Sequence, residues 1–264
     1  MKNKKDYAIV HYTCQSFYDD LCGKSPRIVA ICILLPYYGQ INTFSIPIIA
    51  EEKGIDLAAA NSIKLDELES EMLKKYFEYL RSNSHIGKWL HWNMCDSNFG
   101  FQAIEHRYTV LTRRNPPVKI SDDHKLNISW LLSCLYGENY AENPKLLNLL
   151  MMNEMSPRHF LSGADEAKAF TERKYLLMER SSHSKVGCFF AILEKTGNNE
   201  LKTNCRKWRD VYGISVSGIV SYIKENVVLA LICSLAGAVL IGILGNIIVK
   251  MMFPQCWLTK SPRS

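Results

Sequence analysis

The sequence predicts an α/β domain with a mixed sheet and flanking helices, followed by one membrane-spanning helix near the C-terminus. Three observations support this prediction. Apolar, β-branched runs occur early in the chain, segments of helical period then alternate with a further strand, and residues 227–249 carry no charged side chain. Strands joined by short turns and followed by α–β–α alternation are typical of a mixed sheet with helices packed on it.

The first elements are predicted to be strands. Residues 7–12 (YAIVHY), 27–35 (RIVAICILL) and 41–49 (INTFSIPII) are rich in β-branched and aromatic side chains. The segment PYYGQ at 36–40 carries proline and glycine, which favour a turn. We therefore expect the second and third strands to form an antiparallel hairpin.

Helical periodicity then replaces the strand pattern. In residues 65–80, apolar side chains recur at intervals of three and four, as in an amphipathic helix. A short strand is expected around Trp89–Trp92. Further helices are predicted at 98–111, 126–135 and 145–152, from about Asp165 onward, and at 173–193.

The uncharged run at 227–249 is predicted to cross a membrane. It contains 23 residues, and at 1.5 Å per residue a helix of that length spans about 35 Å, against about 30 Å for the hydrocarbon core. One face of this helix carries small and polar side chains at intervals of four, which favours self-association in lipid. These side chains are Ser234, Ala238, Gly242 and Asn246.

Charge and cysteine content limit the cellular setting. The chain has a net charge of +6 and nine cysteines, none of them in a CxxC pair. Scattered cysteines and an N-terminus without an apolar signal region favour a reducing compartment. We expect a single-pass membrane protein whose N-terminal domain is cytoplasmic. Its expected parts are a folded domain at 1–172, a helical extension at 173–226, the span at 227–249 and a tail at 250–264.

Residues 7–171 resemble the DEDD-type, proofreading exonuclease family, whose domain is ribonuclease H-like. Three segments carry the resemblance: RIVAICILLPYYGQINTFSI, LHWNMCDSNFGFQAIEHRY and FLSGADEAKAFTE. Enzymes of this family hold two metal ions with four carboxylates. The metal ions activate water and stabilise the leaving oxygen. The resemblance implies Asp96 and Asp165 as catalytic carboxylates, with Glu166 as an alternative to Asp165, and Mg²⁺ or Mn²⁺ as cofactor only if the chain is catalytic.

The first strand departs from this family. Where the family carries an aspartate and a glutamate, this chain reads IVHYTCQ, and Gln15 stands at a former glutamate position. Two carboxylates are too few to bind two divalent ions well. The resemblance therefore favours a degenerate domain that binds a ligand without cleaving it. Gln15, Asn93, Arg113 and Arg114 are the candidate ligand-binding residues, and the arginines suit phosphate contacts. Asp96 and the arginines also have plainer interpretations, as a helix cap and a solvated helix end.

Three functions therefore compete. The first is a membrane-anchored, non-catalytic sensing or binding module whose tail helix self-associates, as in a defence effector that acts on membranes. The second is a membrane-tethered, metal-dependent 3′–5′ exonuclease. The third is a scaffold that docks a partner protein to the membrane. The expected partners are membrane lipid, further copies of the chain, and a nucleic acid, nucleotide or protein.

Overall fold

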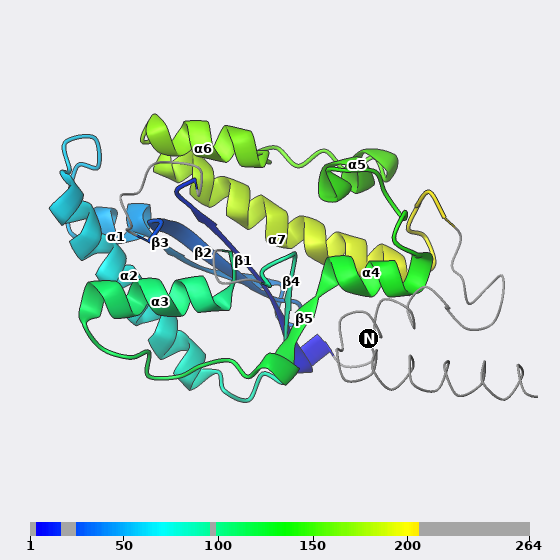
Figure 1. Ribbon diagram of the computed structural model, residues 1–264, viewed down its shortest axis with the longest axis horizontal. Helices are drawn as coiled ribbons and strands as arrows, with labels where there is room; N and C mark the ends of the chain where they lie inside the picture. The colour runs from blue at the N-terminus through cyan, green and yellow to red at the C-terminus, as the bar shows by residue number, and fades with distance from the viewer. Residues whose placement is uncertain (1–3, 17–24, 96–98, 206–264) are drawn as a thin grey trace, which may run out of the picture. The chain divides into compact units, whose positions relative to one another are not determined.

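The computed structural model describes residues 4–16, 25–95 and 99–205, which form an open mixed sheet with flanking helices (Figure 1). The strands lie in the order β3-β2-β1-β4-β5. The central strand β1 (Tyr7–Cys14) is antiparallel to β2 (Ile28–Leu35) and parallel to β4 (Lys88–His91). At the edges, β3 (Gln40–Ser45) is antiparallel to β2, and β5 (Lys125–Asn127) is parallel to β4. The predicted α/β class with a mixed sheet is confirmed.

The predicted hairpin of β2 and β3 is present, but its second strand is shorter than expected. Gly39 lies in the turn at φ +63°, a left-handed conformation that glycine adopts without steric cost. Strand β3 ends at Ser45, and helix α1 (Ile46–Glu52) begins there, whereas the predicted strand continued to residue 49. The Ser45 hydroxyl accepts a hydrogen bond from the Ile48 N–H, and Pro47 lies in the first turn, where no N–H is needed.

One face of the sheet is apolar and packs on two helices. Ala8, Val10 and Tyr12 of β1 alternate with residues of the opposite face and join a core with helices α2 (Ser62–Ser82) and α3 (Phe101–Thr112). The apolar stripe predicted at 65–80 is the buried face of α2. The Asn61 side chain caps this helix by accepting a hydrogen bond from the Lys64 N–H.

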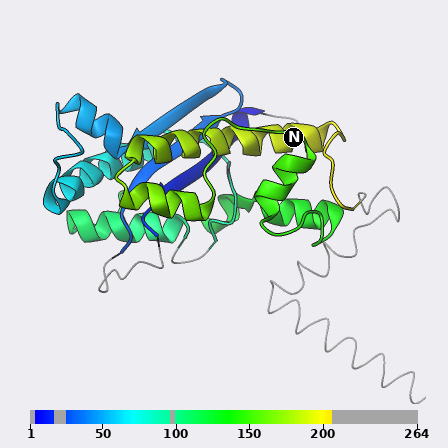
Figure 2. The ribbon, with the colours of Figure 1, turned by 90° about the horizontal axis from the view of Figure 1, so that it is seen from above.

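The opposite face of the sheet carries small and polar side chains beside apolar ones such as Ile9 and Leu34. It includes His11 and Thr13 of β1, and the strand register places Cys32 beside His11 and Ala30 beside Thr13. Helix α7 (Tyr175–Gly197) lies against β1 and β2 on this face and contributes buried serines and a lysine (Figures 1 and 2). We call this region, between α7 and the sheet, the polar layer.

The other described helices agree with the sequence pattern, with two corrections. Helix α5 (Lys145–Met152) has the predicted bounds, and α6 (Gly163–Thr171) begins near Asp165 as expected. Helix α4 (Ile128–Tyr136) begins two residues later than predicted, because the chain first forms β5. Helix α7 begins only after a break at which Arg173 adopts φ 56°. Short 3₁₀ helices at Lys4–Asp6 and Asp122–His124 precede β1 and β5.

The chain divides into two compact units. One comprises Met1–Leu132 and Asn139–Cys205, and the other comprises Ser133–Glu138 and Arg206–Ser264, of which only Ser133–Glu138 are described. The predicted boundaries at 172, 226 and 249 stay predictions. Within the described ranges, no helix combines the length and apolar character needed to cross a membrane. The predicted span at 227–249 lies outside the described residues.

Candidate ligand site at the carboxyl ends of the parallel strands

The strand order marks one edge of the sheet as the place for a site. The chain lays β2 and β3 on one side of β1 and then crosses to β4 and β5 on the other side. Ligands of open α/β sheets bind beyond the carboxyl ends of parallel strands at such a switch point. Gln15 directly follows β1, Asn93 follows β4 by two residues, and Asn127 ends β5.

Two side-chain amides are paired at this edge. The Asn127 Nδ2 group donates hydrogen bonds to Asn93 Oδ1 at 3.1 Å and to Cys95 Sγ at 3.2 Å. In return, Asn127 Oδ1 accepts the Asn93 N–H at 3.2 Å and the Ser129 N–H at 3.0 Å. Asn93 is exposed and has φ 53°, a left-handed conformation that asparagine tolerates better than most residues. We call Asn93, Cys95 and Asn127 the amide cluster.

Gln15 joins the end of β1 to the start of β2. Its N–H donates to the Arg27 carbonyl at 2.8 Å, and its Oε1 accepts the Arg27 N–H at 3.5 Å. Gln15 is half-buried, and its side chain serves the backbone where β1 and β2 separate. In the structure, the predicted ligand-binding residue Gln15 thus contacts the Arg27 backbone, and its role in ligand binding stays a prediction.

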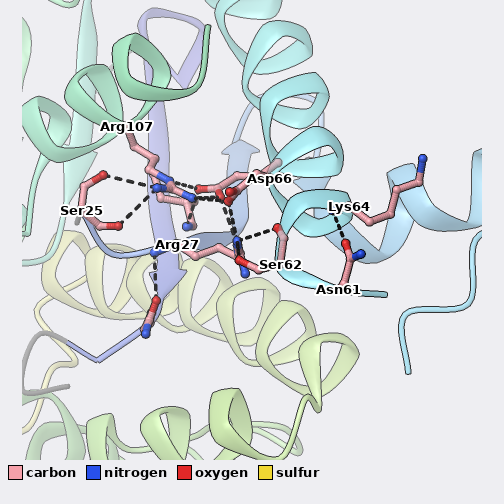
Figure 3. Close-up of polar contacts among 10 residues, drawn as sticks. Ser25, Arg27, Asn61, Ser62, Lys64, Asp66 and Arg107 are labelled. Carbon is pink, nitrogen blue, oxygen red and sulfur yellow. Dashed lines mark hydrogen bonds and ion pairs between the residues drawn. The ribbon is translucent and has the colours of Figure 1, made fainter. Parts of the chain in front are cut away.

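Behind this edge lies a buried ion network that sequence reasoning missed (Figure 3). The Glu69 carboxylate is fully buried and accepts hydrogen bonds from Arg107 Nε at 2.8 Å and Nη2 at 2.6 Å, and from the Ile28 N–H at 2.8 Å. Arg27 Nε donates to the same carboxylate at 3.3 Å, and both arginines also bind Asp66. The network joins α2, α3 and the start of β2.

Burial and charge act in opposite directions on Glu69. Desolvation raises the pKa of Glu69, while the Arg107 guanidinium opposes that shift by stabilising the carboxylate. The sequence did hold a signal for this residue. Glu69 follows Leu65 by four positions and precedes Met72 by three, so it lies on the apolar stripe of α2, where an acid requires a buried partner.

A second buried ion pair lies in the polar layer. Glu166 of α6 accepts hydrogen bonds from Lys185 Nζ at 2.8 Å and from the Ser181 hydroxyl at 3.1 Å. The side chains of Lys185 and Glu166 are only 8% and 15% exposed, so little water screens this pair. Burial, and then the Lys185 charge, lower the pKa of His11 on β1 well below its usual value. A buried ammonium group therefore lies near the end of β1.

The predicted catalytic carboxylates are not brought together in the described residues. Asp165 is exposed and forms a capping box at the start of α6, in which its carboxylate accepts the Ser162 hydroxyl at 2.7 Å. The hydrogen bonds from Ser162 lower the pKa of Asp165. Asp96 lies outside the described residues. Catalytic roles for both residues stay predictions.

The remaining candidates are at the far end of α3 and in the tail. Arg113 and Arg114 are exposed, and Arg113 ends α3 in a left-handed conformation at φ 57°. The helix-association residues predicted in the tail lie outside the described residues: Ser234, Ala238, Gly242 and Asn246.

No cluster of three histidine, cysteine or acidic side chains suited to a metal ion occurs among residues 4–16, 25–95 and 99–205. A role for Mg²⁺ or Mn²⁺ stays a prediction tied to catalysis.

Comparisons with known proteins do not support the family predicted from the sequence. No protein-family model matches the chain, and a search of curated proteins found no similar sequence. In addition, the acid expected in the last family motif caps its own helix, and no described helix is fit to cross a membrane. The assignment to DEDD-type exonucleases carrying a membrane helix is therefore wrong. What the structure shows is an open mixed α/β sheet with flanking helices.

Proposed function

We propose that residues 4–205 form a non-catalytic module that binds single-stranded nucleic acid at the carboxyl ends of β1, β4 and β5. The amide cluster is the observation that carries this proposal, because it presents an exposed asparagine at the switch point of the sheet. The strand order, with β1 central and β2 alone running opposite to the other four described strands, is compatible with a ribonuclease H-like sheet.

The chemistry of the amide cluster suits nucleobases. A side-chain amide carries both donors and acceptors, and such groups read the hydrogen-bonding edges of bases that are splayed out of a helix. The Nδ2 group of Asn93, with its two donor hydrogens, takes no part in the bonds to Asn127, since the Asn93 oxygen and backbone N–H make those contacts. Asn93 is therefore the residue expected to contact a base directly.

The buried Lys185–Glu166 pair favours binding over metal-dependent cleavage. Its ammonium group lies close enough to the end of β1 to act on both His11 and Cys14. Because the Glu166 carboxylate is already bound by Lys185, it is not available as a ligand for a divalent cation. The pair thus supports a site that recognises its ligand by hydrogen bonds.

Two exposed arginines extend the proposed surface. Helix α3 begins at Phe101, just beyond the amide cluster, and ends before Arg113 and Arg114. Its 12 residues span about 18 Å, so one extended strand could contact the amide cluster with its bases and the arginines with its phosphates.

Fluorescence anisotropy of the full chain with labelled single-stranded DNA and RNA of varied sequence tests the proposal. Asn93→Gly removes the amide while permitting the left-handed backbone, and it should weaken binding of the preferred sequence about tenfold. The double variant Arg113→Gly/Arg114→Ala should weaken binding of all sequences to a similar extent. It should also reduce the slope of log K against log salt concentration by roughly one to two, as expected for the loss of two phosphate contacts. Arg81→Ala, at an exposed site on α2, is the matched control. Absence of binding at low salt to every oligonucleotide would reject the proposal.

The uncharged run at 227–249 motivates a second, independent proposal, which rests on the sequence alone. We propose that it attaches the chain to a membrane and that the face carrying Gly242 self-associates. Recovery of the full chain in the membrane fraction after an alkaline wash would support attachment, and recovery in the soluble fraction would reject it. Gly242→Leu should then abolish detergent-resistant oligomers, whereas Leu240→Ile, at another position of the same run, should leave them intact.

A further inference from the structure

Four buried polar atoms in the polar layer have no hydrogen-bond partner within the described part of the chain. They are the Thr13 hydroxyl, the Ser182 hydroxyl and both ring nitrogens of His11. Thr13 and Ser182 are 1% and 0% exposed, and His11 is 7% exposed. Buried polar groups in folded proteins are nearly always hydrogen-bonded, because desolvating a donor or acceptor without a partner is costly.

The strand register and the period of α7 bring these groups into one region. Thr13 pairs with Ala30, and Ala30 pairs with Ser45, so the three form one row across the sheet. Glu179 of α7 binds Ser45 at one end of this row. On β1, two residues from Thr13, the His11 ring contacts the Phe189 ring of α7, with centroids 5.6 Å apart. Ser182 is about one turn beyond Glu179 and two turns before Phe189, so along α7 it lies between the contact with Ser45 and the contact with His11.

Between Thr13 and Ser45, Ala30 contributes only a methyl group to this face of the sheet. The charged groups nearby already have partners. The Lys185 ammonium forms an ion pair with Glu166, and the Glu179 carboxylate accepts a hydrogen bond from the Ser45 hydroxyl. The unmatched groups that remain are uncharged donors and acceptors. They suit a small, uncharged partner that can both donate and accept hydrogen bonds.

We propose that the polar layer is an internal hydration site, in which an ordered water molecule bridges Thr13 of β1 to Ser182 of α7. Such a water fixes α7 to the sheet at a point where no direct side-chain bond joins them. Buried waters of this kind make two to four hydrogen bonds and belong to the fold. His11 lies two residues from Thr13 on the same face, and its ring is the natural third partner.

The sign of a stability change tests the proposal. Thr13→Val keeps the shape of the side chain and removes its hydroxyl. If a water bridges Thr13 to Ser182, this variant should raise the unfolding equilibrium constant of the full chain about fivefold. If the hydroxyl has no partner, replacing it with a methyl group should instead lower that constant. Urea titration followed by circular dichroism at pH 7.5 measures it.

A double-mutant cycle of Thr13 and Ser182 gives a second, independent test. Ser182→Ala should act non-additively with Thr13→Val, because either change removes the same bridge. Ser181→Ala is the matched control, since Ser181 bonds Leu161 and Glu166 directly and should combine additively with Thr13→Val. Additive behaviour of the Thr13 and Ser182 variants would overturn the proposal.

Direct detection closes the test. A crystal structure at better than about 1.8 Å, or nuclear Overhauser contacts from water to the Thr13 methyl group, should show the water in the wild-type chain and its loss in Thr13→Val. A destabilised Thr13→Val chain with no such water in the wild type would also overturn the proposal, because some other partner would then hold the hydroxyl.

Discussion

Acid should destabilise this fold through two buried histidines, His11 and His91. Burial lowers the pKa of His11 well below 6.5, and burial together with the Lys125 charge lowers the pKa of His91 to about 4. Both rings are therefore neutral in the folded chain at neutral pH. In the unfolded chain both take up a proton as the pH falls through about 6.5.

The sign of the effect follows from proton uptake. Below pH 6.5 the unfolded chain binds more protons than the folded chain, so the free energy of unfolding falls as the pH falls. Each histidine contributes a slope of about 1.4 kcal/mol per pH unit. For His91 this loss begins at 6.5 and ends near its folded pKa of about 4, which amounts to about 3 kcal/mol. His11, whose pKa is also lowered in the folded chain, adds a loss of the same sign. Together they remove a large part of the stability of a typical domain, which is about 5–15 kcal/mol.

Urea unfolding of the full chain at half-unit steps from pH 7.5 to 4.5 measures this slope. His11→Leu should reduce it by about 1.4 kcal/mol per pH unit relative to wild type, because one proton is no longer taken up. His183→Ala, at an exposed position of α7, controls for a histidine that the fold leaves in solvent. An unchanged slope in His11→Leu would refute the reasoning, since it would mean that His11 is protonated to the same extent in both states.

Three further changes test the described contacts by thermal or chemical unfolding. Glu69→Ala should lower the free energy of unfolding by about 3–5 kcal/mol because it leaves two arginines without their buried partner. Asp66→Ala should lower it by less than about 2 kcal/mol, because the Asp66 side chain is 42% exposed. Equal losses in the two variants would contradict the burial of Glu69. Ser162→Ala should cost about 0.5–2 kcal/mol by removing the cap of α6, and no loss of stability would argue against the capping box. Gly39→Ala should cost about 1 kcal/mol because of its left-handed backbone, whereas Gly163→Ala, with open space at its Cβ position, should be nearly neutral.

Local sequence patterns determined much of the secondary structure. The stripe of α2 has the helical period, PYYG marks the turn between β2 and β3, and the bounds of α5 follow from its apolar run. These features depend on neighbouring residues, so they can be predicted without knowledge of the fold. The end of β3 shows the limit of this reasoning, because apolar residues 46–49 suit either a strand or a helix, and the Ser45 cap with Pro47 decides for α1.

The site could be predicted only in part. Gln15 was a candidate because it stands at a former glutamate position of the family that the sequence resembles, and Asn93 because it lies where a predicted strand ends. Both lie at the carboxyl edge of the sheet. Their neighbours were not identified, because Asn127 reaches Asn93 across 34 positions of sequence and Glu69 reaches Arg107 across 38. Such pairs depend on strand order and helix packing, which leave no periodic trace in the sequence.

By itself, the sequence determined the class of the fold, the hairpin and the amphipathic helices, because each depends on interactions within a few residues. Only the tertiary structure decided that β1 is the central strand and that α7 covers the face that carries His11 and Thr13. The physical reason is that burial is shared between distant segments. His11 and Thr13 look like ordinary strand residues until α7, more than 160 positions later, closes over them and removes them from water.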